Sequence, residues 1–291
     1  MKFVSYLDAV KAGEETLAAA GIVDAKIDAK YLFESMPGHD SNFLLLYGRR
    51  QMDEDQRLAY EALIQKRASH IPLQHILGYT EFMGLRFTVN EHVLCPRQDT
   101  ETLVELAQSY LQPGCRVLDM CTGSGCILIS LLALGKRGVV EPGGFVGVAS
   151  DISEEALEVA KQNAEDQRVE IRFLQGDLFD SLQALPTEER RFDLIVSNPP
   201  YIPTAGVWSL MPEVRDHEPK IALDGSDTGL VFYERLTSQA SEFLKPGGRM
   251  LVEIGYDQAE DVCQLFREHG FSDVVCHKDL AGNDRVVMGH L

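Results

Sequence analysis

The stretch LDMCTGSGC, residues 118–126, joins an apolar run to a glycine-rich turn and then to a second apolar run. The first run predicts a strand, and the second predicts a helix that begins at Cys126. Gly123 and Gly125 would let the backbone approach a ligand, and the helix start offers unpaired N–H groups. We therefore expect a ligand at this turn; a tight turn that binds nothing also fits the glycines taken alone.

The chain beyond this stretch repeats the alternation of strand and helix. Helices are expected at 126–134 and 154–164, and strands at 116–119, 145–150, 169–174, 192–197 and 249–254, with further strands near 272–276 and 285–288. This alternation predicts an α/β fold in which helices cover both faces of a parallel sheet. Open sheets of this kind bind ligands at the carboxyl ends of their strands.

The first 75 residues lack this alternation and have helical patterns instead. Ser5 and Asp8 form a predicted capping box, and Asp53 precedes a further helix. Residues 79–95 then show short alternating runs that predict a β-hairpin. We expect three segments: a helical bundle at 1–75, a hairpin linker at 76–95 and an α/β domain at 96–291.

The composition narrows the classes of partner. The chain has 291 residues, a formal net charge of −18 at pH 7 and 45% hydrophobic residues. Such an acidic field repels nucleic acid, no segment has the apolar length of a membrane span, and the first residues become charged too early for a secretory signal. Six cysteines without paired spacing and scattered histidines indicate reduced thiols and no metal site. We expect a cytoplasmic protein that binds neither nucleic acid nor membranes.

Two details of the glycine-rich turn indicate its ligand. The spacing Gly-x-Gly-x-x-Leu, which starts at Gly123, lacks the third glycine of the dinucleotide fingerprint. Asp119 precedes the turn, where a carboxylate suits a sulfonium better than a pyrophosphate. We therefore predict S-adenosyl-L-methionine as the cofactor, with Asp151 on the ribose hydroxyls and Gly176-Asp177-Leu178 closing over the adenine.

A second motif, SNPPYIP at 197–203, follows the predicted strand at 192–197. Proline lacks an N–H and restricts the residue before it, so Asn198, Pro199 and Pro200 predict a stiff turn. The Asn198 side-chain oxygen and the Pro199 carbonyl would accept both hydrogens of one planar NH₂ group, against which Tyr201 would stack. This would aim the lone pair of a poor nucleophile at a methyl donor. A rigid loop without chemistry is the alternative.

With these motifs in place, the chain resembles the bacterial protein-glutamine methyltransferases that modify class 1 peptide-chain release factors, the PrmC/HemK family. The resemblance runs from about residue 70 to the end, and the first 70 residues match only in general character. The matching stretches are PLQHILGYTEFMGLRFTVNEHVLCPRQDTETLVE (72–105), VLDMCTGSGCI (117–127), SDISEEALEVAKQNA (150–164), FDLIVSNPPYIP (192–203), HEPKIALDGSDTGLVFYERL (217–236), LKPGGRMLVEIG (244–255) and DLAGNDRVV (279–287).

The resemblance implies a seven-stranded, Rossmann-like, class I S-adenosylmethionine-dependent methyltransferase domain and a helical N-terminal domain that helps dock the release factor. The implied substrate is the glutamine side chain of a Gly-Gly-Gln motif, the cofactor product is S-adenosyl-L-homocysteine, and we expect a monomer. By motif, the implied cofactor-binding residues are Cys121, Thr122, Gly123, Ser124, Gly125, Asp151, Asp177, Leu178 and Asn198. The implied catalytic and substrate-binding residues are Asn198, Pro199, Pro200 and Tyr201.

Two positions depart from the family pattern. Cys121 stands where the family usually has the first glycine of its loop, and cysteine tolerates fewer backbone angles than glycine. Arg97-Gln98-Asp99-Thr100-Glu101 replaces the commoner Arg-Pro-Glu-Thr-Glu. Neither departure touches the residues that would hold the glutamine amide.

Two other functions remain to be weighed against glutamine methylation. An amine methyltransferase acting on DNA or RNA bases would use Asn198 to Tyr201 in the same way, but it needs phosphate contacts, and the sequence has no basic stripe. A noncatalytic cofactor-binding or interaction protein is the second alternative. The intact Asn198-Pro-Pro-Tyr motif disfavours it, because lost activity would free these residues to change.

Overall fold

The structure, a computed structural model, describes residues 4–135 and 146–291 and divides into two units. The first unit is the chain up to Gly78 together with Met211–His217. The second unit is Tyr79–Leu210 together with Glu218–Leu291. The backbone therefore passes from one unit to the other after Gly78, after Leu210 and after His217.

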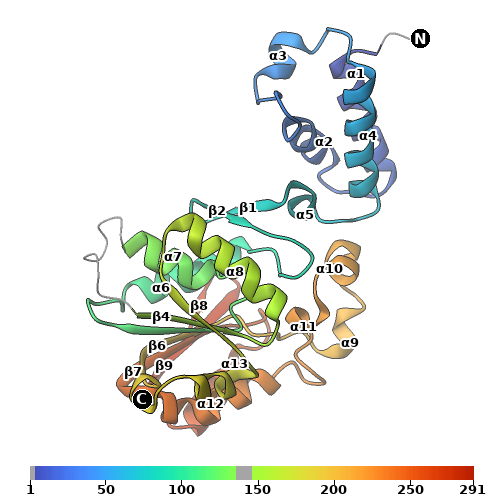
Figure 1. The fold of residues 1–291 in the computed structure, drawn as a ribbon. Helices are drawn as coiled ribbons and strands as arrows, with labels where there is room; N and C mark the ends of the chain where they lie inside the picture. Colours follow the sequence, from blue (N-terminus) through green and yellow to red (C-terminus); the bar gives the residue numbers. More distant parts are fainter. Residues whose placement is uncertain (1–3, 136–145) are drawn as a thin grey trace. The chain divides into compact units, whose positions relative to one another are not determined.

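The first unit is helical (Figure 1), as the sequence predicts. Ser5 and Asp8 form the predicted capping box: the Asp8 N–H donates to Ser5 Oγ at 3.2 Å, and the Ser5 N–H donates to Asp8 Oδ2 at 3.1 Å. Asp53 stands at the start of its helix, but its side chain makes no capping hydrogen bond. The helices are α1 Tyr6–Ala19, α2 Ala25–Glu34, α3 Phe43–Tyr47, α4 Glu54–Ala68, α5 Leu73–Leu77 and α10 Pro212–His217.

Helix α10 belongs to this unit because of one buried cation. The Arg67 side chain, 6% exposed, donates to Asp28 Oδ2 at 2.7 Å and to Glu213 Oε1 at 2.5 Å. The His217 ring nitrogen Nε2 also lies 3.1 Å from the Ser69 carbonyl oxygen. The sequence analysis gave residues 211–217 to the α/β domain, so the observed division differs at this segment. The local sequence around residues 211–217 does not indicate that Glu213 pairs with Arg67, which lies far earlier in the chain.

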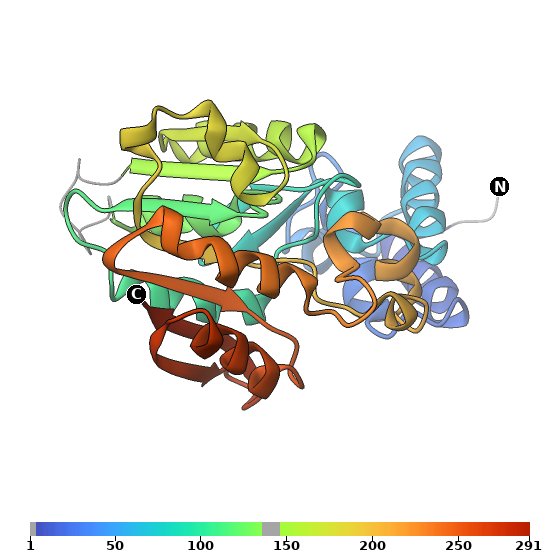
Figure 2. The same cartoon turned by 90° about the horizontal axis from the view of Figure 1, so that it is seen from below.

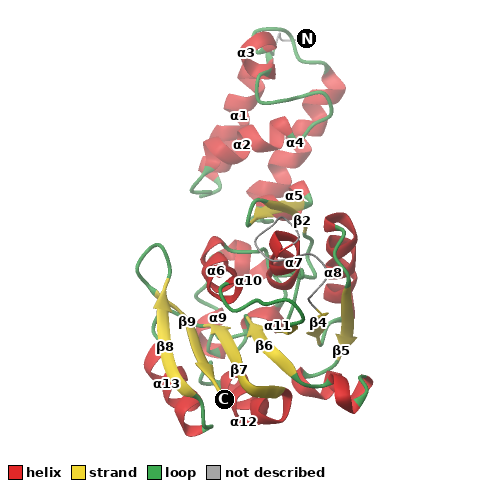
Figure 3. Cartoon of the chain, turned by 90° about the vertical axis from the view of Figure 1, so that its left-hand side faces the viewer, coloured by secondary structure: helices red, strands yellow, loops and turns green. Residues whose placement is uncertain are grey.

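The second unit is built on a seven-stranded sheet (Figure 3). In spatial order the strands are β5 Ile171–Gln175, β4 Val146–Asp151, β3 Arg116–Met120, β6 Phe192–Ser197, β7 Leu244–Glu253, β9 Asp284–His290 and β8 Ser272–Lys278. The strands β5, β4, β3, β6 and β7 pair in parallel in this order, whereas β9 runs antiparallel to both of its neighbours, β7 and β8. The expectation of a wholly parallel sheet is wrong at β9, because the few residues between β8 and β9 allow only an antiparallel return.

Helices cover both faces of this sheet, as predicted (Figures 1 and 2). One face carries α6 Glu101–Gln108, α7 Cys126–Leu134 and α8 Glu154–Gln167, and the other carries α12 Val231–Phe243 and α13 Ala259–Glu268. Each face has its own buried apolar cluster. At the carboxyl ends of β3, β4, β5 and β6 lie the segments that connect each strand to the next element.

The hairpin consists of β1 Tyr79–Phe82 and β2 Leu85–Thr88, which pair antiparallel. Phe82, Leu85 and Phe87 are buried in the same apolar cluster as α6 and α7. The Asn163 side chain of α8 also accepts from the Thr88 N–H at 2.7 Å and donates to the Thr88 carbonyl at 3.0 Å. The hairpin is thus part of the second unit, whereas the sequence analysis assigned 76–95 to a linker.

The remaining segments of the second unit are short. They are η1 Gln98–Thr100, η3 Leu178–Ala184, η4 Thr187–Glu189, α9 Thr204–Val207 and α11 Lys220–Leu223. Of the strand predicted at 145–150, Phe145 lies outside the described residues, and β7 begins at Leu244 rather than at residue 249. Among the described residues, no helix combines the length and the apolar character that crossing a membrane requires.

Candidate active site

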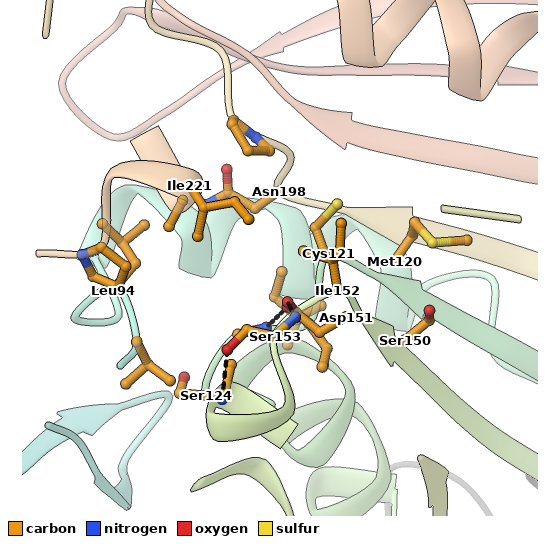
Figure 4. Close-up of a pocket in the computed structure, with 18 of the residues that line it drawn as sticks. Leu94, Met120, Cys121, Ser124, Ser150, Asp151, Ile152, Ser153, Asn198 and Ile221 are labelled. Atoms are coloured by element: carbon orange, nitrogen blue, oxygen red, sulfur yellow. Dashed lines mark hydrogen bonds between the residues drawn. The ribbon is translucent and has the colours of Figure 1, made fainter. Parts of the chain in front are cut away.

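A cavity of about 280 Å³ lies in the second unit at the carboxyl ends of β3, β4, β5 and β6 (Figure 4). Of the residues that the sequence analysis proposed, the cavity brings together Cys121, Thr122, Gly123, Ser124, Asp151, Asp177, Leu178, Asn198 and Pro200. Gly125, Pro199 and Tyr201 do not line it. The segment 92–97, α11 and α12 complete its wall.

The glycine-rich turn after β3 is held in left-handed backbone angles. Cys121, Gly123 and Gly125 have φ of 58°, 54° and 80°. The Thr122 N–H donates to the Ser150 carbonyl at 3.0 Å, which ties the turn to the end of β4. Gly125 lies behind the cavity wall, where an added Cβ would come within 2.7 Å of Ile129 Cδ1. Gly125 therefore serves close packing of α7, and Cys121 keeps an angle that favours glycine.

Asp119 supports this turn from beneath. It is fully buried, and the Thr122 hydroxyl donates to its Oδ2 at 2.6 Å. Burial raises the pKa of Asp119 to about 7, and the Thr122 hydrogen bond acts against that rise. Asp119 does not line the cavity, so any effect of its charge on a sulfonium would act from behind the cavity wall. The last residue of β3 that faces the cavity is Met120, because side chains alternate along a strand.

Asp151, at the end of β4, presents a carboxylate to the cavity. Its Oδ2 accepts from the Gly123 N–H at 2.9 Å and its Oδ1 from the Ser153 N–H at 3.0 Å. These bonds fix the side chain and link it to the glycine-rich turn. Burial raises the pKa of Asp151, and the backbone hydrogen bonds oppose that rise. Each oxygen keeps a second lone pair, which suits hydroxyl donors such as those of a ribose.

The loop after β5 forms a further part of the cavity wall. Leu178 stands at a left-handed φ of 49° and lines the wall with Asp177. Arg235 of α12 donates to Asp177 Oδ2 at 2.8 Å, and Phe232 adds an aromatic ring to the same lining. The sequence analysis missed Arg235 and Phe232, because their partners lie in a distant part of the chain. Apolar walls with one ion pair at the edge suit a flat ring such as adenine.

Asn198 stands where β6 ends and lines the cavity. Its side-chain Nδ2 donates to Thr100 Oγ1 at 3.4 Å. The Ser197 hydroxyl donates to the Met120 carbonyl at 2.7 Å, which joins the ends of β6 and β3. The sequence analysis did not single out Thr100, which lies nearly a hundred residues before Asn198.

The backbone beyond Pro200 is held on two sides. The Gln258 side chain donates through Nε2 to the Tyr201 carbonyl at 3.0 Å. On the other side, the Ile202 N–H donates to the Leu223 carbonyl at 3.0 Å, and the Gly225 N–H donates to the Ile202 carbonyl at 2.8 Å. Residues 201 and 202, which directly follow the two prolines, are therefore held on both sides. Gln258 had no signal in the sequence, because only the folded chain brings it to the loop.

Behind this loop lies a buried acidic group. The Tyr201 hydroxyl donates to Glu253 Oε1 at 3.4 Å, and Glu253 is 2% exposed. Burial raises the pKa of Glu253 to about 7; the Thr100 hydroxyl and the Arg285 charge act against that rise. Arg285 is itself paired with Asp279 at 3.1 Å and Asp99 at 3.3 Å. The sequence analysis named none of these charged residues as part of the site.

These features together define a class I methyltransferase domain: a glycine-rich turn after β3, an acidic residue that ends β4, and Asn-Pro-Pro-Tyr after β6. Residues 111–287 match the family described as a methyltransferase domain. A solved methyltransferase from Pyrococcus furiosus shares the fold at 20% identity with a TM-score of 0.50; the match covers 71% of this chain and 89% of that one.

The particular family follows from both units. Residues 8–78 match the PrmC N-terminal domain. The release factor glutamine methyltransferase of Geobacter sulfurreducens is 40% identical over 275 residues, which cover 94% of this chain and 93% of that one. The enzyme of that name from Agrobacterium fabrum is 38% identical over 284 residues, which cover 95% and 94%. The chain belongs to the release factor glutamine methyltransferase family, which confirms the resemblance and extends it to the first 70 residues.

Proposed function

We propose that this protein transfers a methyl group from S-adenosylmethionine to the side-chain amide nitrogen of the glutamine in the Gly-Gly-Gln motif of class 1 release factors. The observation that supports the proposal most directly is Asn198, which follows β6, lines the cavity and precedes a loop that Gln258 holds at the Tyr201 carbonyl. Membership of the release factor glutamine methyltransferase family supports the same substrate.

The cavity fits the cofactor. Asp151 offers carboxylate lone pairs for the ribose hydroxyls, the turn at Cys121–Gly125 offers a close backbone approach, and Leu178 with Ile152 and Phe232 offers apolar walls for the adenine. The bound cofactor would supply a methyl group activated by its sulfonium. Because that methyl is already activated, the protein needs to orient the acceptor rather than provide a strong base.

The loop would orient that acceptor. The Asn198 Oδ1 and the Pro199 carbonyl accept the two N–H groups of the glutamine amide and leave the nitrogen lone pair directed at the methyl carbon. Orientation of this kind contributes up to about 7–11 kcal/mol to lowering a barrier. As the amide nitrogen forms the new N–C bond with its lone pair, the bond between the methyl carbon and the cofactor sulfur would break, its electron pair would stay on sulfur, and S-adenosylhomocysteine would leave. The nitrogen would then release one proton to water. A glutamate lacks both N–H donors, so the loop would reject it by a factor of about 10⁴.

The charge of the chain is consistent with a protein substrate. A net charge of −18 opposes the close approach of nucleic acid phosphates, whereas a release factor needs no phosphate-binding field. We assign docking of the release factor to the first unit, whose sequence matches the PrmC N-terminal domain. The protein would act as a monomer in the cytoplasm, where its substrate is found.

The test is a transfer assay with methyl-labelled S-adenosylmethionine. Purified release factor, its Gly-Gly-Glu variant and duplex DNA serve as parallel substrates. We expect label in the release factor alone, and none in the Gly-Gly-Glu variant or with the Asn198→Ala enzyme. Label in the DNA, or an unlabelled release factor, would contradict the proposal and leave the methyltransferase fold without this substrate.

A further inference from the structure

We propose that Asn163 is a positioning residue that holds two parts of the cavity wall together, the glycine-rich turn at 121–125 and the segment at 92–97, and thereby sets the affinity for the cofactor. The inference rests on the proposed function, because it takes the cavity to bind S-adenosylmethionine. Asn163 does not itself line the cavity, so it acts through the backbone that it holds.

Asn163 is a fully buried amide on the inner face of α8. Among the buried residues of α8, a helix that lies entirely in the described part of the chain, Asn163 alone is polar. A buried amide has one acceptor end and one donor end, and leaving either end unpaired costs stability. The partners of Asn163 therefore show what it is for.

These partners are backbone groups of two separate segments. Asn163 Oδ1 accepts from the Thr88 N–H at 2.7 Å, and Nδ2 donates to the Thr88 carbonyl at 3.0 Å. Nδ2 also donates to the Ser124 carbonyl at 2.9 Å. The oxygen faces an N–H group and the nitrogen faces two carbonyls, so one direction of the amide satisfies all three contacts. One side chain thus joins Thr88 to Ser124.

Each of the two joined residues leads to a part of the cavity wall. Ser124 belongs to the glycine-rich turn and lines the cavity. Thr88 ends β2, and the chain runs on from it into the segment 92–97. This segment contributes five lining residues, which are His92, Val93, Leu94, Pro96 and Arg97. Figure 4 shows Leu94 and Ser124 among the side chains around the cavity.

Apolar contacts of α8 bring both parts of the wall close but do not fix them. Ala160 lies against the turn, where a Cβ added at Gly125 would come within 3.2 Å of the Ala160 Cβ. Val93 of the wall segment shares a buried cluster with Ala156. Apolar burial is non-directional, so it tolerates small shifts of one part against the other. The three hydrogen bonds of Asn163 have defined directions and fix the relative position.

The bridge therefore prepares the cavity for its ligand. Without Asn163, the Ser124 carbonyl and both backbone groups of Thr88 would lose their partner and would turn toward water. The turn and the wall segment would then hold their binding positions in only a fraction of the molecules. The apparent affinity for a ligand falls in proportion to that fraction. Once the cofactor is bound, the walls are back in place and the transfer step is unaffected.

The experiment compares Asn163→Leu, Asn163→Ala and Gln167→Leu in the full-length enzyme. Leucine keeps about the same volume without polar atoms, whereas alanine leaves a space bordered by three polar groups that one water molecule can bridge. Gln167→Leu is the matched control. Gln167 lies one turn further along α8, donates to the Arg86 carbonyl of the same hairpin at 2.9 Å and does not line the cavity.

The readouts are the Kd for labelled S-adenosylmethionine by equilibrium dialysis, kcat on release factor with saturating cofactor, and urea unfolding. We expect Asn163→Leu to raise the Kd about tenfold, the effect of one lost hydrogen bond. Asn163→Ala should raise it less, because the bridging water restores part of the contact. Gln167→Leu should keep the wild-type Kd. All three should keep kcat near wild type, a split between Kd and kcat that a purely structural role would not produce.

Three results would overturn the inference. The first is a wild-type Kd in Asn163→Leu, and the second is an equal rise of the Kd in Gln167→Leu, which would assign the effect to any loosening of the hairpin. The third is a larger rise in Asn163→Ala than in Asn163→Leu, which would assign it to lost volume. If urea unfolding shows that Asn163→Leu does not fold, the comparison of Asn163→Ala with Gln167→Leu decides. A wild-type enzyme that does not bind S-adenosylmethionine would instead refute the proposed function.

Discussion

Gln258 bridges two segments of backbone: its Nε2 donates to the Tyr201 carbonyl at 3.0 Å while its Oε1 accepts from the Gly255 N–H at 2.9 Å. The side chain is 8% exposed and does not line the cavity. One amide therefore ties the Asn-Pro-Pro-Tyr loop to the end of β7. Only a group with one donor end and one acceptor end fits between these partners.

Gln258→Glu tests this bridge. The carboxylate would keep the bond from Gly255 but would set a second acceptor against the Tyr201 carbonyl, at a cost of about 1–3 kcal/mol in the free energy of unfolding. We expect kcat to fall while cofactor affinity stays near wild type. Urea unfolding and the transfer assay measure both effects. Gln264→Glu, at an exposed position on α13, should alter neither, and equal losses in the two variants would contradict the prediction.

Cys121 carries strain that glycine would not. Its φ of 58° lies in the left-handed region, where a Cβ costs about 1–2 kcal/mol. Both Cys121→Gly and Cys121→Ala remove the thiol, but only glycine removes the Cβ. We expect the glycine variant to unfold at higher urea than the alanine variant, by about 1 kcal/mol in the free energy of unfolding. An alanine variant at least as stable as the glycine variant would show that this angle is not strained.

Arg67 supports the first unit through two acceptors, the buried Asp28 and the half-buried Glu213. Arg67→Met would leave Asp28 and Glu213 without their cation, and breaking a buried pair in this way costs about 3–5 kcal/mol. Burial raises the pKa of Asp28 even with Arg67 present. Arg57→Met is the control, because the partners of Arg57, Glu54 and Glu61, are exposed. Urea unfolding should separate the two variants clearly; similar stabilities would refute the role of Arg67.

Asp119 makes stability depend on pH in a defined direction. Its pKa is raised by burial from 3.8 to about 7, so between these values the folded protein holds a proton that the unfolded chain releases. Stability from this group is therefore lost as the pH rises through that window. Asp119→Asn removes the effect, so its free energy of unfolding relative to wild type should increase from pH 4 to pH 7. Parallel stability curves would contradict the raised pKa.

Local patterns in the sequence were sufficient for the parts of the site that one segment builds. The turn at 121–125 and the prolines at 199 and 200 restrict their own backbones, so their geometry follows from the residues themselves. The strand and helix alternation likewise places both motifs at the carboxyl edge of one sheet. These expectations agree with the structure at β3, α7 and β6.

The parts that failed depend on distant partners. Thr100, Gln258 and Glu253 reach the loop only after the sheet has formed, and none stands in a pattern that marks it. Asp119 was expected to suit a sulfonium, and its sequence neighbours showed that a carboxylate precedes the turn but not that it is fully buried. The orientation of β9 was missed because alternation predicts that strands exist, whereas their direction depends on the length of the connection.

The discontinuous first unit has a consequence for how the chain is made. A ribosome delivers the chain up to Gly78 early, but it delivers Met211–His217 only after four of the seven sheet strands, β3 to β6, have been synthesised. Until then Arg67 can pair with Asp28 but not with Glu213. During synthesis the first unit therefore lacks helix α10 until residues 211–217 have been made. A fragment that stops at Gly78 would lack both this helix and the ion pair between Arg67 and Glu213.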